Sequence, residues 1–157
     1  MSDPIRAHIV KLLGWNEAHV GFDAAVANLP EPLRGRRVEG FPHSVWELVE
    51  HLRLAQRDLL DFCRDPNYKA PNWPDDYWPA SAAPPDAAAW DRSLKAFGAD
   101  REALQAFAAD PRLDLAARIP HGTGQTYLRS ILLVADHNAY HIGQVVAVRQ
   151  QLGAWSS

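Results

Sequence analysis

Three histidines have the spacing that a metal site needs. His137 and His141 are four residues apart in a largely apolar segment that runs from Tyr127 to Leu152. Residues four apart stack on one face of a helix, so both imidazoles can reach the same ion at about 2 Å. His51 lies on a second apolar-periodic segment far upstream. A helical fold that brings the two segments together would build a three-histidine metal site.

All three histidines are expected to face the interior of the fold. His137 and His141 share a helix face with valines, and His51 shares one with Leu48 and Leu52. Burying two imidazoles without partners would cost on the order of several kcal/mol, whereas a metal satisfies both lone pairs. Three protein ligands leave a position open for water or substrate, as in reactive zinc sites. The alternative is a bundle without metal, in which the histidines bond to water and neighbouring carboxylates.

The first two helices are expected in the N-terminal part of the chain. The first spans about Asp3 to Asn28, with Asp3 as its N-cap and Pro4 at its first helical position. A loop rich in Pro, Gly and Arg follows, through Pro42. The second helix begins at Ser44, where Ser44 and Glu47 have the spacing of a capping box, and it ends near Asp65.

Two further helices follow a long connector. The third is predicted over Asp86 to Ala109, with Gly98 permitting a kink, and the fourth runs from residue 124 or 125 to Leu152, ending at Gly153. The connector, Pro66 to Pro85, contains six prolines and four large aromatic residues. It either packs as a crossover over one end of the core or forms a lid over the mouth of the metal site.

These elements predict an all-α protein, a single four-helix-bundle domain over residues 1–157. No alternating strand pattern competes with the helices. The connector is long enough for the third helix to run parallel to the second, which gives an up-down-down-up bundle. The segment from Asp114 to Pro120 is expected to be extended or irregular.

Composition excludes several classes of function. Lys and Arg total 16 against 19 Asp and Glu, a net charge of −3, so the chain lacks the basic footprint of a nucleic-acid partner. Its one cysteine, Cys63, excludes an internal disulfide and a cysteine-based zinc site, and is expected to be buried and inert. Without a signal pattern or a membrane-spanning apolar run, the protein is expected to be cytoplasmic, with no membrane contact.

Several segments also resemble a known family. They are residues 46–52, WELVEHL; residues 136–144, DHNAYHIGQ; residues 120–126, PHGTGQT; and the tail Leu152-Gly153. On these residues the chain resembles the DinB/YfiT-like family of metal-dependent enzymes. The resemblance implies an up-down-down-up four-helix bundle, often a homodimer, with a divalent metal on three histidines. Those ligands correspond to His51, His137 and His141.

The resemblance also carries expectations about cofactors and substrates. It suggests zinc, nickel or iron, and imidazole ligands alone do not choose among these metals. Some relatives are S-transferases that use bacillithiol, mycothiol or glutathione, and one related group isomerises maleylpyruvate. A low-molecular-weight thiol is therefore a candidate cofactor and a small molecule the candidate substrate.

Three other residues are candidates for a role at the site. Glu47 lies one turn before His51, where a capping box is the favoured role and a carboxylate supporting an imidazole N–H is the alternative. Gln144 could bond a water or substrate on the metal, or cap a buried polar cluster. His19 is a candidate for proton transfer if the first helix faces the metal. His43, His121 and Asp58 are expected at the surface.

The leading functional hypothesis is a metal-dependent enzyme of the thiol S-transferase type. The metal would lower the pKa of a bound thiol, which attacks an electrophilic small molecule. A metal-dependent hydrolase, with water in place of the thiol, fits the same ligands. The third hypothesis is a non-catalytic metal-binding stress-response protein, whose site would be closed by a fourth side chain such as Glu47 or His19.

Overall fold

The computed structural model describes residues 3–155, so the outermost two residues at each end of the predicted domain lie outside the description. The fold is all-α, as predicted. Within residues 3–155 the strand-like pairing is limited to an isolated antiparallel bridge between Arg118 and Thr126. The elements in chain order are α1 Pro4–Leu12, α2 Phe22–Val26, α3 Glu31–Arg34, α4 Val45–Arg64, the 3-10 turn η1 Asp75–Tyr77, α5 Ala89–Ala109 and α6 Tyr127–Gln151.

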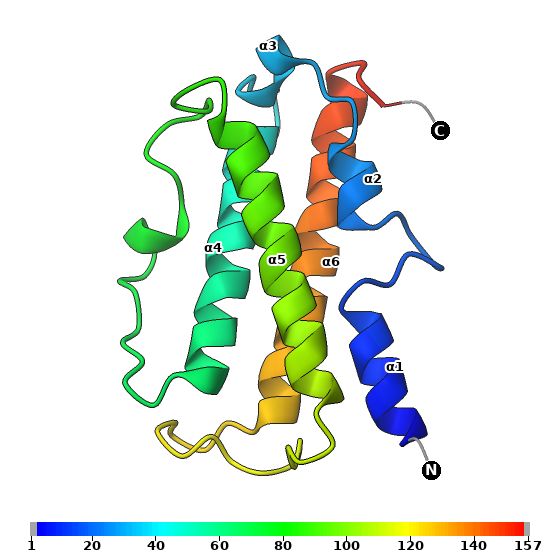
Figure 1. The fold of residues 1–157 in the computed structure, drawn as a ribbon. Coiled ribbons are helices and arrows are strands. Elements are labelled where there is room, and N and C mark those ends of the chain that lie inside the picture. Colours follow the sequence, from blue (N-terminus) through cyan, green and yellow to red (C-terminus); the bar gives the residue numbers. More distant parts are fainter. Residues whose placement is uncertain (1–2, 156–157) are drawn as a thin grey trace.

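The long helices run up, down, down and up. Figure 1 shows α1 and α6 running in one direction and α4 and α5 in the other. The two downward helices are parallel because the connector between them climbs the length of the bundle on the outer side of α4 (Figure 1). Helix α4 packs against both α5 and α6.

The second helix begins where its capping box predicts. The Ser44 hydroxyl accepts the Glu47 N–H at 3.2 Å, and Glu47 Oε2 accepts the Ser44 N–H at 2.8 Å. These two bonds satisfy donors that the first turn of a helix leaves unpaired. The arrangement fixes the start of α4 and therefore the register of His51, two turns into the helix.

The other predicted helix ends hold to within a few residues. Helix α5 starts three residues after Asp86, because the Asp86 carboxylate instead accepts the Ala88 N–H at 2.9 Å. Gly98 does not interrupt this helix. Helix α6 begins after Thr126, whose hydroxyl accepts the Arg129 N–H at 3.1 Å. It ends before Gly153, whose φ of +66° is a left-handed conformation that suits glycine.

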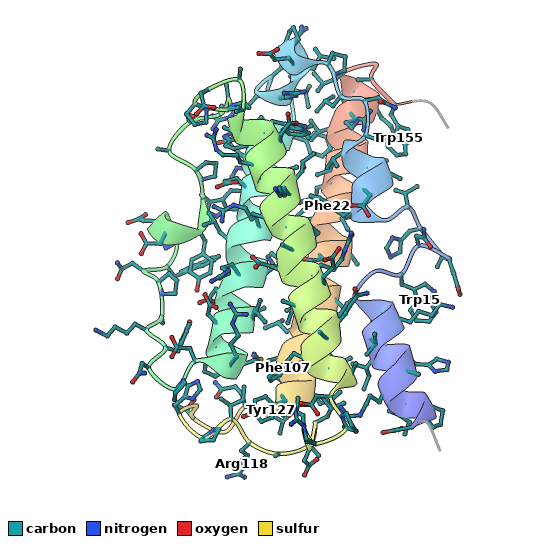
Figure 2. All side chains as sticks on the ribbon, viewed as in Figure 1. Trp15, Phe22, Phe107, Arg118, Tyr127 and Trp155 are labelled. Carbon is teal, nitrogen blue, oxygen red and sulfur yellow. The ribbon has the colours of Figure 1, made fainter. Side chains whose placement is uncertain are left out.

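The single first helix predicted over residues 3–28 is wrong. Helix α1 ends at Leu12, the chain crosses a loop that carries Trp15 (Figure 2), and α2 resumes at Phe22. Two glycines bracket the loop: Gly14 bonds back to Lys11 O at 3.1 Å, and Gly21 is the N-cap of α2. Each glycine costs a helix about 1 kcal/mol relative to alanine, so a break is cheapest at these two positions. The following loop, predicted as irregular, contains the short helix α3.

The core forms two apolar clusters separated by a polar layer. One cluster gathers α2, α4, α5 and α6 around Phe22 and Phe97, whose rings stack at 3.8 Å; the other gathers α1 and the opposite half of the bundle around Leu104. Between them Asn138 donates to Gln56 at 3.0 Å, and Gln56 donates to the Phe97 carbonyl at 2.8 Å. These buried amides tie α6 and α5 to α4 at the level of the candidate site.

Aromatic side chains lie near both ends of the bundle. Phe107 and Tyr127 meet at 5.6 Å at one end, and Trp155 lies over the Arg149 guanidinium at the other (Figure 2). Within residues 3–155, no helix has both the length and the apolar character needed to cross a bilayer.

Candidate metal centre

The structure brings the three predicted histidines together between α4 and α6. His51 is buried, and His137 and His141 are half-buried. One ring nitrogen from each residue can be chosen so that all three lie within 4.8 Å of one another. The Nε2 atoms of His51 and His137 are 3.0 Å apart, and the ring of His141 lies 4.6 Å from that of His51.

Hydrogen bonds orient two of the three rings. His51 Nδ1 donates to the Tyr77 carbonyl at 2.8 Å, and His141 Nδ1 donates to Gln144 Oε1 at 2.7 Å. A neutral imidazole with its proton on Nδ1 has its lone pair on Nε2. The lone pairs of His51 and His141 are therefore on Nε2, the outer-partner arrangement that supports metal-bound histidine.

The donor set fits a divalent metal. Bonds of about 2.0–2.1 Å from one ion hold any two ligand nitrogens no more than about 4.2 Å apart. The nitrogens here lie within 4.8 Å of one another, so small rotations of the half-buried His137 and His141 side chains close the site. The contact between the Nε2 atoms of His51 and His137 already joins two of the three rings across α4 and α6.

The electrostatics of the cluster keep all three rings neutral at physiological pH. Burial lowers the pKa of His51, His137 and His141 below the usual imidazole value, and the neighbouring imidazoles add to this effect at His51 and His137. The largest shift is at His137, where burial and the two adjacent rings lower the pKa to about 4. Neutral imidazole is the form that binds a metal, so the site is prepared for coordination before the ion arrives.

This shift predicts that the metal-free protein loses stability in acid. An unfolded histidine titrates near 6.5, whereas His137 in the fold titrates near 4. Between these values the unfolded state binds more protons, so the free energy of unfolding falls as pH falls from about 6.5 to about 4. Chelator-treated protein should show this loss in urea unfolding across the range, and His137→Gln should show a shallower one.

His8→Gln is the matched control for that measurement. His8 is exposed on α1, and its ring bonds to the nearby Pro4 carbonyl. Its variant should keep the pH dependence of the parent. Equal slopes for the parent and His137→Gln would contradict the assignment of a low pKa to His137.

The connector covers one face of the cluster. The indole of Trp78 stacks on the His51 ring at 3.9 Å with an angle of 1° between the planes, and His43 stacks on the same indole at 3.8 Å. The connector is thus a packed crossover over α4, and its opening as a lid stays a prediction. His43, expected at the surface, instead takes part in this stack beside the site.

Comparison with known sequences agrees with this geometry. The sequence model of the DinB superfamily matches residues 15–145, which include all three histidines. The chain belongs to the DinB superfamily. No curated protein and no solved structure matched it. For this DinB-superfamily chain, the family match and the histidine cluster together support a metal-binding protein.

Of the other predicted site residues, Gln144 contacts the histidine cluster and Glu47 does not. Gln144 lies at the edge of the cluster, where its amide accepts from His141 and donates to the Tyr140 hydroxyl at 3.3 Å. Glu47 caps α4 and pairs with Arg37, and in the described residues no hydrogen bond joins it to His51. Its carboxylate is therefore committed to the helix end.

The structure does not bring His19 to the cluster. His19 lies in the loop between α1 and α2, where its ring donates to the Val20 carbonyl at 2.9 Å. This loop and the connector that covers His51 lie on opposite sides of the bundle (Figure 1). His19 was a candidate only if the first helix faces the metal, and His19 lies outside α1, which ends at Leu12.

Sequence reasoning missed the link between the connector and the cluster. Asp58, expected as a charge at the solvent edge, accepts hydrogen bonds from the hydroxyls of Tyr68 at 2.5 Å and Tyr77 at 2.7 Å. Two features of the sequence could have indicated this link: Asp58 lies two turns after His51 on the same helix, and the connector is rich in aromatic residues. Nothing in the local sequence indicates which side chain on α4 these aromatic residues meet.

The lone cysteine is buried, as predicted. Cys63 is buried on α4, and burial raises the pKa of its thiol to about 11. A thiol with that pKa holds very little thiolate at neutral pH, so Cys63 is no nucleophile.

Proposed function

We propose that this DinB-superfamily protein binds a divalent metal through His51, His137 and His141 and transfers a low-molecular-weight thiol to an electrophilic small molecule. The observation that carries the metal proposal is the convergence of three neutral imidazoles whose nitrogens lie within 4.8 Å of one another. Zinc, nickel and iron all accept imidazole, so the proposal names this group and no single metal.

A bound ion would supply Lewis acidity and lower the pKa of a thiol or water that it holds. The surrounding residues determine how the three histidines are exposed and oriented. His137 and His141 are half-buried, which leaves the cluster open on the α6 side, while Trp78 covers the ring of His51. The Tyr77 carbonyl and Gln144 fix the orientation of His51 and His141. Burial raises the pKa of the Cys63 thiol, so in this proposal the nucleophile comes from a small thiol such as bacillithiol, mycothiol or glutathione.

Two other functions use the same site. A metal-dependent hydrolase needs water in place of the thiol and no change in the ligands. A non-catalytic metal-binding stress-response protein needs a fourth side chain to close the site, and neither Glu47 nor His19 is placed to do so. That placement favours an enzyme over an inert binder. The homodimer, the cytoplasmic location and the single domain remain predictions from the sequence.

Conjugation of a thiol to a model electrophile tests the proposal. Protein loaded with zinc, nickel or iron would be incubated with 1-chloro-2,4-dinitrobenzene and each of the three thiols. The thiol sulfur bonds to the ring carbon, chloride leaves and the thiol proton passes to solvent. We expect the conjugate, measured by mass spectrometry, to form faster with metal-loaded parent than with His137→Ala treated in the same way.

Two further results separate the alternatives. Turnover of an ester panel without any thiol, lost in His137→Ala, would favour the hydrolase. The absence of metal-dependent conjugation with all three thiols, in protein shown to carry stoichiometric metal, would contradict the transferase proposal.

A further inference from the structure

A second hydrogen-bonded cluster lies two turns from the histidines. Asp58 follows His51 by seven residues on α4, about 10 Å along the helix axis. Its two carboxylate oxygens each accept one tyrosine hydroxyl, Oδ1 from Tyr68 and Oδ2 from Tyr77. Burial, with the adjacent carboxylate, raises the pKa of both tyrosines above the usual value, so both hydroxyls stay protonated and able to donate.

Tyr77 connects this cluster to the candidate metal centre. Its hydroxyl bonds to Asp58, and its backbone carbonyl accepts the His51 Nδ1–H at 2.8 Å. The next residue, Trp78, stacks on the same imidazole. Tyr77 therefore bonds to α4 at two points, through its side-chain hydroxyl and through its backbone carbonyl.

The segment around Tyr77 is also held internally. It forms the 3-10 turn η1, and the Asp76 carboxylate accepts the Asn72 N–H at 2.8 Å. Because η1 is compact, the hydrogen bond from the Tyr77 hydroxyl to Asp58 also restrains the position of the Tyr77 backbone carbonyl. A proline-rich connector without such an anchor would sample many conformations, and a single bond to His51 would then be intermittent.

We propose that Asp58 is a positioning residue for the candidate metal centre: by holding the hydroxyls of Tyr68 and Tyr77, it keeps the Tyr77 carbonyl on His51 Nδ1. The His51 Nε2 lone pair then stays directed at His137 and His141. The proposal depends on the proposed function only where metal affinity is its readout, because the orientation of His51 can be measured without metal.

A purely structural role for Asp58 makes a different prediction. If Asp58 only stabilised the fold, its loss would affect all three histidines alike. If it acts through Tyr77, its loss changes the tautomer of His51 and spares His141, whose Nδ1 bonds to Gln144 instead. The tautomer of each histidine, measured at its ring nitrogens, therefore distinguishes a positioning role of Asp58 from a purely structural one.

The first arm of the test is nitrogen NMR of metal-free protein labelled with ¹⁵N-histidine. The parent should show His51 with its proton on Nδ1. Asp58→Ala should shift His51 toward a mixture of tautomers while His141 stays unchanged. The double variant Tyr68→Phe/Tyr77→Phe removes both hydroxyls but keeps the Asp58 carboxylate and the Tyr77 carbonyl. It should produce the same change at His51, and it replaces Asp58→Ala in the test if that variant folds poorly.

Asp61→Ala is the matched control. Asp61 lies on the same helix, three residues after Asp58, and pairs with Arg57 and Arg64 of that helix. Its variant should leave the His51 ring signals as in the parent. Parental His51 signals in both Asp58→Ala and the double tyrosine variant would overturn the proposal.

The second arm measures zinc affinity by competition with a chromogenic chelator. Loss of an outer hydrogen-bonding partner typically weakens a metal site about 10- to 100-fold, and we expect Asp58→Ala to fall in that range. The double tyrosine variant should reproduce this loss, whereas Asp61→Ala should keep the parental affinity. An equal loss in Asp61→Ala and Asp58→Ala would overturn the action of Asp58 through His51. A parent that binds no zinc would contradict the proposed function, and the ring signals would still decide the role of Asp58.

Discussion

Replacing His137 with alanine is expected to abolish stoichiometric metal binding. The Nε2 atom of His137 lies 3.0 Å from that of His51, so its loss leaves two imidazoles from different helices. The fall in affinity should exceed the roughly 10- to 100-fold loss that follows removal of an outer partner. Elemental analysis of protein purified without a histidine tag, followed by zinc titration calorimetry, measures both stoichiometry and affinity.

The same substitution at an exposed histidine serves as the control. His8→Ala on α1 should retain one equivalent of metal with parental affinity. Alanine favours helix, so α6 is expected to persist in His137→Ala, which circular dichroism can verify. One equivalent of tightly held metal in His137→Ala would show that this residue is not a ligand.

Truncation of Phe97 is expected to produce the largest loss of stability. Phe97 is 1% exposed on α5, and its ring stacks on Phe22 of α2. Phe97→Ala removes this stacking and leaves a cavity at the contact of α2, α5 and α6, at a cost of about 3–5 kcal/mol. Urea unfolding at neutral pH measures the change in the free energy of unfolding.

Phe107→Ala makes the same chemical change at a less buried position. Phe107 is half-buried on α5 and meets Tyr127 near one end of the bundle. Its truncation should cost clearly less than that of Phe97, because the site borders solvent and leaves a smaller closed cavity. Equal losses for the two variants would argue against the packing of α2 on Phe97 described above.

Local signals were enough to predict the helices that build the site. The capping box at Ser44 fixes the start of α4, and apolar periodicity places His51, His137 and His141 on inward faces. The length of the connector permitted α5 to run parallel to α4, and the family resemblance implied that arrangement. These features depend on residues within one or two helical turns, where propensity and capping dominate.

Features that depend on tertiary contacts were not predictable in the same way. Apolar residues stay in helical phase across the break between α1 and α2, so periodicity alone does not reveal it. Glu47 had two roles consistent with its spacing, and the ion pair with Arg37, from the preceding loop, commits its carboxylate to the helix end. Asp58 likewise acquires its role only when the connector folds back on α4.

Anomalous diffraction from crystals of the zinc-loaded protein tests whether the three histidines coordinate one metal ion. Data on either side of the zinc absorption edge locate the ion without assumptions about its ligands. We expect one strong peak between α4 and α6, at about 2.0–2.1 Å from a ring nitrogen of each of His51, His137 and His141. A peak bound by other residues, or an empty histidine cluster in protein that carries stoichiometric zinc, would contradict this expectation.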